Sequence, residues 1–252
     1  MSSRLIVLAV VAASLGFWSP SQAAVLFSEN FDGVVTPTLP AGWTTSATDA
    51  GVPWITSEVG SFSNPNNAFT PDPAAVGTAT LVSPLIAIPL GSGATLDFRN
   101  RYETEDGFDG GVLELSIGGG AFQDIVAAGG AFTSAGYNGE LGDASGNPLG
   151  GRQAWTGSSG GYLLTSVDLP STVSGQSIQL RWIFGTDDSV GATGWRLDDV
   201  LLSDVTSVPE PGTLYFLAAI FTGVAIVQRR LLGAFRRKPR TSRSERRTPA
   251  DS

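Results

Sequence analysis

The sequence predicts an all-β protein whose body is a two-sheet antiparallel sandwich, followed by one C-terminal transmembrane helix. Between residues 25 and 204, short runs rich in β-branched and aromatic residues alternate with clusters of Gly, Pro, Asn and Asp. No apolar period of 3.6 residues persists in this region, which argues against a helical body. Many short strands separated by regular turns are typical of a sandwich.

The first segment of the 252-residue chain, residues 1–23, is predicted to be a secretory signal peptide. It has a positive charge at Arg4, an apolar stretch over residues 5–17, and small residues at Ser21 and Ala23 before the expected cut. The alternative is an uncleaved anchor, but this apolar stretch is shorter than the roughly 20 residues that span a bilayer.

The body is predicted to cover residues 24–207 and to contain at least seven strands. These expected strands lie at residues 78–88, 94–103, 111–118, 121–127, 161–169, 177–184 and 194–202. In one of them Leu113 and Leu115 point one way while Glu114 and Ser116 point the other. This alternation predicts a half-buried antiparallel strand.

The charge of the body is strongly negative. Between residues 25 and 208 there are 20 acidic residues, 5 arginines and no lysine, a net charge of 5 − 20 = −15, whereas 9 of the 15 basic residues follow residue 228. An acidic body excludes nucleic acid as a partner and favours cations. The sequence has no Cys and no His, so it offers no thiol nucleophile, no zinc-thiolate site and no histidine base.

Three stretches of the body carry a family resemblance. They are "FSENFDG" with the following "LPAGWT", the central "YETEDGFDGGVLELSIGGGAFQDI" and the closing "RWIFGTDDSVGATGWRLDDVLL". These stretches resemble the jelly-roll modules of secreted bacterial proteins, and they are similar to choice-of-anchor J, cleaved-adhesin and MAM-type domains. The resemblance covers most of residues 27–202 and implies a jelly-roll sandwich of binding or structural type.

The same resemblance implies a structural calcium ion. In such jelly rolls the first and last strands lie near each other, and a calcium ion often ties the termini together. Carried over to this chain, the ligands would be Glu29, Asp32 and one of Asp198 or Asp199.

The alternation of the last expected strand, residues 194–202, gives a separate reason to expect a partner for Asp199. If Trp195 and Leu197 face the core, Asp199 falls on the buried face as well, where an unpaired charge is costly. A metal ion or an arginine is then expected beside it. The alternative to calcium is a salt bridge from Arg181 or Arg196.

A second candidate calcium set lies in the stretch "TEDGFDGG", with Glu105, Asp106 and Asp109 as ligands. Calcium takes six to eight oxygen ligands, which acidic turns can supply. The alternative is that Asp and Gly only form turns there. The pair Asp187 and Asp188 is interpreted as a solvated turn.

Four aromatic residues in loop-like surroundings are candidates for a sugar-binding platform, because flat rings pack against pyranose rings. They are Trp43, Trp54, Tyr137 and Trp155. The alternative is that they belong to the core, where most sandwich tryptophans lie. Trp182 and Trp195, within expected strands, are assigned to the core.

The body is predicted not to be an enzyme. The stretch "GSSGG" matches the nucleophile elbow formally, but the chain has no histidine to serve as base. The alternative function is a secreted carbohydrate-active hydrolase that uses paired carboxylates. Glu103 and Glu105 are the pair considered, since residues two apart on a strand share a face.

The C-terminal segment, residues 208–230, has three parts. Its landmarks are Val208, Pro209, Glu210 and Pro211, then an apolar run over residues 213–227, then Arg229 and Arg230. This order resembles the PEP-CTERM sorting signal of Gram-negative bacteria, which a membrane-embedded exosortase recognises and cuts. The run is long enough for a short membrane span, and the arginines favour a cytoplasmic C-terminus. An ordinary single-pass anchor, the alternative, gives no reason for Pro-Glu-Pro.

The resemblance implies a location and partners. The protein is expected in the inner membrane before processing, and at the cell surface or in the extracellular matrix afterwards. An exosortase-type enzyme is the expected processing partner, and exopolysaccharide is a candidate ligand of the body. The last segment, residues 231–252, is basic and expected to be disordered. It either binds anionic lipid or is an overlong reading frame.

Overall fold

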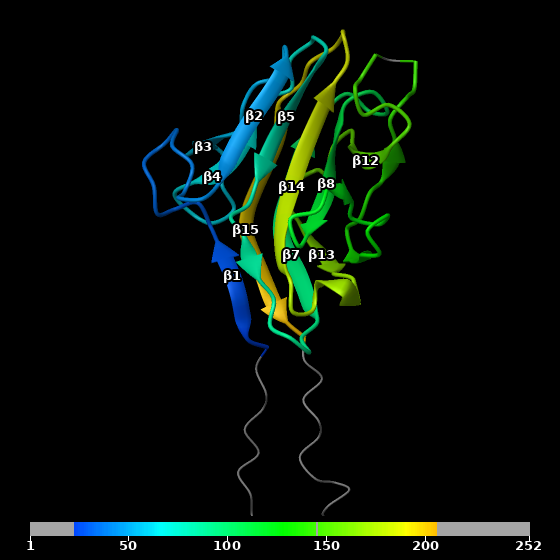
Figure 1. Cartoon of the computed structure of the whole chain (residues 1–252). Helices are drawn as coiled ribbons and strands as arrows, with labels where there is room; N and C mark the ends of the chain where they lie inside the picture. Colours follow the sequence, from blue (N-terminus) through cyan, green and yellow to red (C-terminus); the bar gives the residue numbers. More distant parts are fainter. Residues whose placement is uncertain (1–22, 145, 206–252) are drawn as a thin grey trace, which may run out of the picture. The chain divides into compact units, whose positions relative to one another are not determined.

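The computed structural model describes residues 23–144 and 146–205, which form two antiparallel sheets packed face to face (Figure 1). The two-sheet antiparallel sandwich is therefore confirmed. The signal peptide apart from its last residue, the Pro-Glu-Pro motif, the apolar run and the basic tail lie outside the described residues. Within the described residues, no helix has the length and apolar character needed to cross a membrane.

Sheet A has seven strands in the order β10-β13-β7-β15-β4-β3, with β1 also paired to β15. Their bounds are β1 (Val25–Glu29), β3 (Ile55–Ser57), β4 (Asn67–Thr70), β7 (Ala94–Glu103), β10 (Ala131–Ser134), β13 (Leu163–Asp168) and β15 (Gly194–Asp204). The first and last strands are neighbours, as the family resemblance implies, with Glu29 opposite Val200.

Sheet B has eight strands in the order β11-β12-β8-β14-β5-β2, with β6 also paired to β14 and β9 to β8. Their bounds are β2 (Thr44–Asp49), β5 (Gly77–Val82), β6 (Ile86–Ala87), β8 (Gly110–Ile117), β9 (Gln123–Asp124), β11 (Gly139–Glu140), β12 (Gln153–Thr156) and β14 (Ser177–Thr186). One short 3₁₀ helix, η1 (Ser171–Val173), precedes β14.

The core lies between the sheets and follows from strand alternation. Every second residue of β7 is buried, including Leu96 and Phe98, and β14 faces it with Leu180 and Trp182. Trp195 of β15 is fully buried, so the core assignment of both strand tryptophans is confirmed. The sheets approach closely where a Cβ on Gly111 would lie 2.4 Å from the Trp195 ring.

Strand β8 differs from its expected half-buried character, because seven of its eight residues are buried. Leu113 and Leu115 face the main core, as predicted. The opposite face is covered by the segment containing β11 and β12, where Val112 packs with Leu141 and Leu149. The pattern of one strand does not reveal this second layer.

Candidate functional site

Three loops meet at one end of the sandwich and bring four carboxylates together. The loop after β4 carries Asp72, the loop between β7 and β8 carries Glu105 and Asp109, and the loop between β14 and β15 carries Asp187. Because β4 and β7 both pair with β15 in sheet A, and β8 pairs with β14 in sheet B, these strand ends are neighbours. We call these four residues the loop cluster.

The loop cluster is compact and mostly buried. Glu105, Asp109 and Asp187 each offer a carboxylate oxygen within 4.8 Å of the others, and no second group of this kind occurs among residues 23–144 and 146–205. Asp109 is fully buried, Asp187 is 3% exposed and Asp72 is 5% exposed. Glu105 is half-buried and forms the side of the cluster open to solvent.

Several of these buried oxygens accept no hydrogen bond of standard geometry. Oδ1 of Asp109 accepts a bond of 2.6 Å from the backbone N–H of Asp187, but Oδ2 has no partner. Neither oxygen of Asp72 accepts a hydrogen bond of standard geometry, although the Asp109 carboxyl group and the backbone N–H groups of Glu105 and Ala192 are near enough to interact with it. Buried carboxylates without well-formed hydrogen bonds are costly, so a proton or a cation that neutralises their charge would stabilise this arrangement.

The pKa values of two carboxyl groups in the loop cluster also indicate that their charge needs to be neutralised. Burial raises the pKa of Asp72 above its usual range, and the charge of Glu105 adds to this. Burial also raises the pKa of Asp109, with further contributions from Asp72 and Asp187. Hard oxygen donors without nitrogen or sulfur ligands suit Ca²⁺ or Mg²⁺. The residues present therefore fit a hard divalent cation, of which calcium is one.

The loop cluster overlaps the second predicted calcium set only in part. Glu105 and Asp109 are brought together, but Asp106 is exposed and lies against Gly157 instead. Asp187 was interpreted as part of a solvated turn, and this is wrong: it accepts a turn bond from the Ser189 N–H yet is nearly fully buried. Its neighbour in the sequence, residue 188, is exposed as expected.

Asp72 was missed by sequence reasoning. It stands between Pro71 and Pro73 directly after β4, in a loop with no other acidic residue. An aspartate held between two prolines after a strand is a weak signal. Only the sheet order, which places β4 next to β15, brings it to the other carboxylates.

The first predicted calcium set is placed differently from the loop cluster. Asp198 is fully buried, and its carboxylate accepts hydrogen bonds from Phe62 N at 2.7 Å and from Ser63 N at 3.1 Å. Burial raises the pKa of Asp198 to about 6. Asp198 thus fixes the loop between β3 and β4 to the outer face of sheet A.

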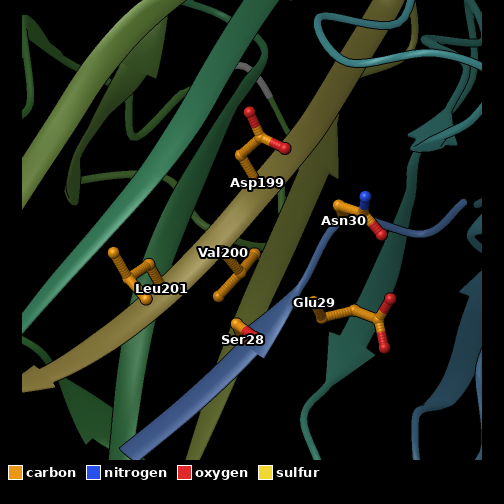
Figure 2. A pocket seen from close by; sticks show the side chains of 6 residues that line it. All are labelled: Ser28, Glu29, Asn30, Asp199, Val200 and Leu201. Atoms are coloured by element: carbon orange, nitrogen blue, oxygen red, sulfur yellow. The ribbon is translucent and has the colours of Figure 1, made fainter. Parts of the chain in front are cut away.

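The other acids of this set also accept local hydrogen bonds. Glu29 accepts from Phe31 N at 2.8 Å, and Asp32 accepts from Asn66 N at 2.8 Å. A hollow of about 350 Å³ lies over the paired strands β1 and β15. In Figure 2 the Glu29 carboxylate points away from Asp199. The first set therefore contributes neighbouring acids but no group of three that share a site within the described residues.

Asp199 is not on the buried face, contrary to the expectation from alternation. Its φ is +45°, and the register of β15 against β7 shifts between Asp198 and Leu201. This bulge places Val200 in the core where the pattern predicts Asp199. The expected arginine partners are absent too: Arg181 pairs with Glu114, and Arg196 donates to an asparagine.

The predicted aromatic platform is wrong for its three tryptophans. Trp43 is 6% exposed, Trp54 is fully buried and Trp155 is 1% exposed. Trp155 stacks edge-on against Phe98, and its Nε1 donates to a backbone carbonyl at 3.0 Å. Trp155 lies within β12, and Trp43 and Trp54 directly precede β2 and β3, so all three belong to the core between the sheets.

Tyr137, the fourth aromatic candidate, lies at a groove. Its hydroxyl is held by the Leu113 backbone and Asp124, and its ring packs against Phe132. The groove has a volume of about 580 Å³ and is mainly apolar. Its lining residues are Asp124, Val126, Ala127, Phe132, Gly136, Tyr137, Arg152 and Gln153.

Comparison with known proteins gives distant likenesses. No family model matches the chain. Bacillopeptidase F of Bacillus subtilis (strain 168) is 28% identical over 177 residues, which is 66% of this chain. The chain spans about a tenth of the length of that relative.

Solved structures with a similar arrangement include two kinds of module. The K1 cleaved adhesin domain of Lys-gingipain from Porphyromonas gingivalis W83 is 17% identical with a TM-score of 0.40, covering 70% of this chain and 96% of the domain. The CBM22-1 xylan-binding domain of Paenibacillus barcinonensis Xyn10C is 12% identical with a TM-score of 0.42, covering 75% of this chain and all of that domain. At these values, function has to be argued from the residues of the chain itself.

Proposed function

We propose that the chain is an exported, non-catalytic binding or structural module whose sandwich is stabilised by a calcium ion in the loop cluster. The observation that carries the calcium site is the burial of Asp72, Asp109 and Asp187 in one place with no arginine ion pair to any of them among the described residues. A divalent cation coordinates several carboxylate oxygens at once and neutralises their charge.

The residues of the chain would perform distinct tasks at this site. The Asp187 N–H holds one oxygen of Asp109 and leaves the other free for the ion. Asp72 and Asp187 bring charge from two further loops, and Glu105 closes the open side. A bound ion would therefore cross-link the loops that follow β4, β7 and β14, and would rigidify this end of the sandwich.

The test is a thermal melt of the full-length protein in EDTA, in millimolar calcium and in magnesium. Calcium at about 100 times its dissociation constant adds roughly 2.7 kcal/mol, or about 5 to 10 °C for a domain of this size. Asp109→Asn should abolish the shift, whereas Asp106→Asn, the neighbouring exposed acid, should keep it. Equal shifts with calcium and magnesium, or no shift with either, would refute the calcium site.

Sorting by an exosortase-type enzyme belongs to the same proposal. It is supported by the order of three parts in the sequence: Pro209-Glu210-Pro211 comes first, an apolar run follows, and Arg229-Arg230 ends it. The N-terminal signal pattern adds to this support. Mass spectrometry of the protein from its native host tests it. A mature chain ending near Pro211 is expected, and an intact chain through Arg230 in cells with a working exosortase would oppose the proposal.

Exopolysaccharide is the proposed partner of the body, and the groove beside Tyr137 is the favoured place for it. Its apolar lining ends in the charged pair of Arg152 and Asp124, so a sugar ring and its hydroxyls both find contacts. A glycan array probed with the full chain tests this. The rival hydrolase function predicts turnover of a bound glycan that disappears in Glu103→Gln and Glu105→Gln variants.

A further inference from the structure

Three of the five arginines between residues 23 and 205 lie together on the outer face of sheet A. Arg99 and Arg101 project from β7, and Arg196 projects from β15 directly opposite Arg101. A Cβ on Gly60 would lie 3.5 Å from Arg101 Nη1 and 3.5 Å from Arg196 Nε, so both guanidinium groups meet at this glycine. Like charges directly opposite each other on neighbouring strands are destabilising.

These arginines have no carboxylate partner. The ion pairs of the described part of the chain involve only the other two arginines, at positions 152 and 181. Asp198 is opposite Arg99 in the strand register, but its oxygens are occupied by Phe62 N, Ser63 N and Asp199 N. Arg196 is 8% exposed, donates to Asn67 and lies 4.0 Å from the centre of the Phe69 ring. In a body with a net charge of −15, Arg99 and Arg101 are therefore two accessible cations without a carboxylate partner, which is unexpected.

Two aromatic rings border the same place. The Arg99 guanidinium lies 4.0 Å from the centre of the Phe62 ring, and that of Arg101 lies 6.0 Å from the Tyr162 ring. The two rings are 5.6 Å apart, and the Tyr162 hydroxyl donates to Gly60 O at 2.9 Å. Phe62 is 45% exposed, so an apolar ring surface remains open to a ligand beside the cationic groups.

We propose that Arg99 and Arg101, with Phe62 and Tyr162, form a binding site for the carboxylate-bearing sugar of an acidic glycan, and that the buried Arg196 adds positive charge behind it. The carboxylate would bind the solvent-facing side of Arg101, because Arg101 and Arg196 pack closely against Gly60 and Arg196 is only 8% exposed. The apolar face of the pyranose would pack on the exposed part of Phe62. Planar guanidinium groups bind carboxylates through paired hydrogen bonds, which a single point charge does not provide.

The position of the site favours a sugar over an acidic peptide. Peptides commonly bind a β-sandwich by adding a strand to a sheet edge. Here β7 and β15 are inner strands of sheet A, so no edge is available at the arginines. The surrounding acidic body also repels a continuous polyanion, which favours a glycan whose acidic units are separated by neutral ones. This proposal goes beyond the function proposed above, since the site is separate from both the loop cluster and the Tyr137 groove.

The test is titration of the full-length protein with glucuronate-containing oligosaccharide, followed by NMR or calorimetry, in parallel with the neutral glucose oligosaccharide of equal length. Glucuronate binding should be at least tenfold tighter than that of the neutral sugar, about 1.4 kcal/mol. Arg101→Gln and Phe62→Ala should each weaken it by a similar factor. Both side chains are accessible, and melting temperature reports whether each variant is folded.

The matched control is Arg181→Gln, which removes one arginine from sheet B. It should leave glucuronate binding unchanged. Equal binding of the acidic and neutral sugars, or full affinity in Arg101→Gln, would overturn the proposal. Equal affinity for acetate would overturn the sugar assignment, and tighter binding of an acidic peptide would replace it with a peptide site. Calcium takes no part in the proposed sugar site, so EDTA should leave glucuronate binding unchanged. At the loop cluster EDTA should instead lower the melting temperature, which distinguishes failure of this proposal from failure of the calcium site.

Discussion

Asp72 and Asp109 place two carboxyl groups in one buried site, and neither is compensated by an arginine. In most proteins a buried acid is neutralised by a salt bridge, as Glu114 is here by Arg152 and Arg181. The two aspartates instead depend on protons or on an external cation. This difference makes the stability of the sandwich sensitive to pH in a way that calcium should reverse.

In EDTA we expect the protein to lose stability as the pH rises. Burial raises the pKa of Asp72 to about 6 and that of Asp109 to about 8, so both hold protons when folded that they release when unfolded. Their stabilising contribution is complete below about pH 4 and is lost as the pH passes through the raised values. Melting temperatures in EDTA should therefore fall between about pH 5 and pH 8, relative to an Asp72→Asn, Asp109→Asn double variant.

Calcium should invert this trend, because it binds the ionised carboxylates and competes with protons. The calcium-induced rise in melting temperature should grow from about pH 5 to pH 8. A rise of equal size at both pH values, or an EDTA curve parallel to that of the double variant, would contradict the assignment of these two groups.

Asp198 should behave as a structural acceptor and not as a metal ligand. Asp198→Asn removes a charged acceptor of the Phe62 and Ser63 N–H groups and should destabilise the protein by about 1 to 3 kcal/mol. The calcium-induced shift in melting temperature should remain. Chemical denaturation with and without calcium measures both quantities, with Asp199→Asn, a half-exposed neighbour, as control. Loss of the calcium shift in Asp198→Asn alone would restore the first predicted set.

Long strands with regular alternation could be predicted from the sequence, and short polar ones could not. The expected range 94–103 coincides with β7, and those at 177–184 and 194–202 fall within β14 and β15. Strands β2, β3 and β4 were not predicted, because their short runs are rich in Thr, Ser and Asn and lack an apolar repeat. The expected strand at 78–88 divides into β5 and β6 at Pro84, which cannot donate to a ladder.

The candidate site was predictable only where its residues are close in the sequence. Glu105 and Asp109 lie on one loop, so the acidic pattern found them. Asp72 and Asp187 come from distant loops, and only the strand order brings them to that loop. The bulge at Asp199 was not predicted either. It shifts the core positions from Trp195 and Leu197 to Val200 and Leu202, but Leu201 is also apolar, so the sequence fits an unshifted alternation as well.

The close approach of the two sheets should make Gly111 intolerant of a side chain. A Cβ there would lie 2.4 Å from the ring of Trp195, a fully buried residue that also donates to Asn100 at 2.7 Å. Gly111→Ala should cost about 1 to 3 kcal/mol through overpacking. Urea denaturation measures it, and Gly119→Ala, in an open turn at positive φ, is the comparison for backbone strain alone. A smaller loss at Gly111 than at Gly119 would show that Trp195 can move aside.

Calcium should act on one end of the sandwich more than on the other. Ligation at the loop cluster should slow amide hydrogen exchange in the loops that carry Asp72, Glu105 and Asp187, while the β1–β15 pair should change little. Hydrogen exchange of the full-length protein with mass spectrometry, in EDTA and in calcium, makes the comparison. Uniform slowing of exchange across both ends would indicate global stabilisation without local ordering.

The path of β15 has a mechanical consequence. This strand begins at Gly194, beside the loop cluster, and ends at Asp204, where β1 begins its pairing at the opposite pole (Figure 1). Its 11 residues span about 35 Å. If a partner bound at the loop cluster is pulled away from a tether beyond Asp204, the force runs along β15. All hydrogen bonds from β15 to β7 and β1 are then loaded in shear at the same time. If Val25 and Asp204 are pulled apart instead, the β1–β15 hydrogen bonds break one after another, so the sandwich should resist the first force better than the second.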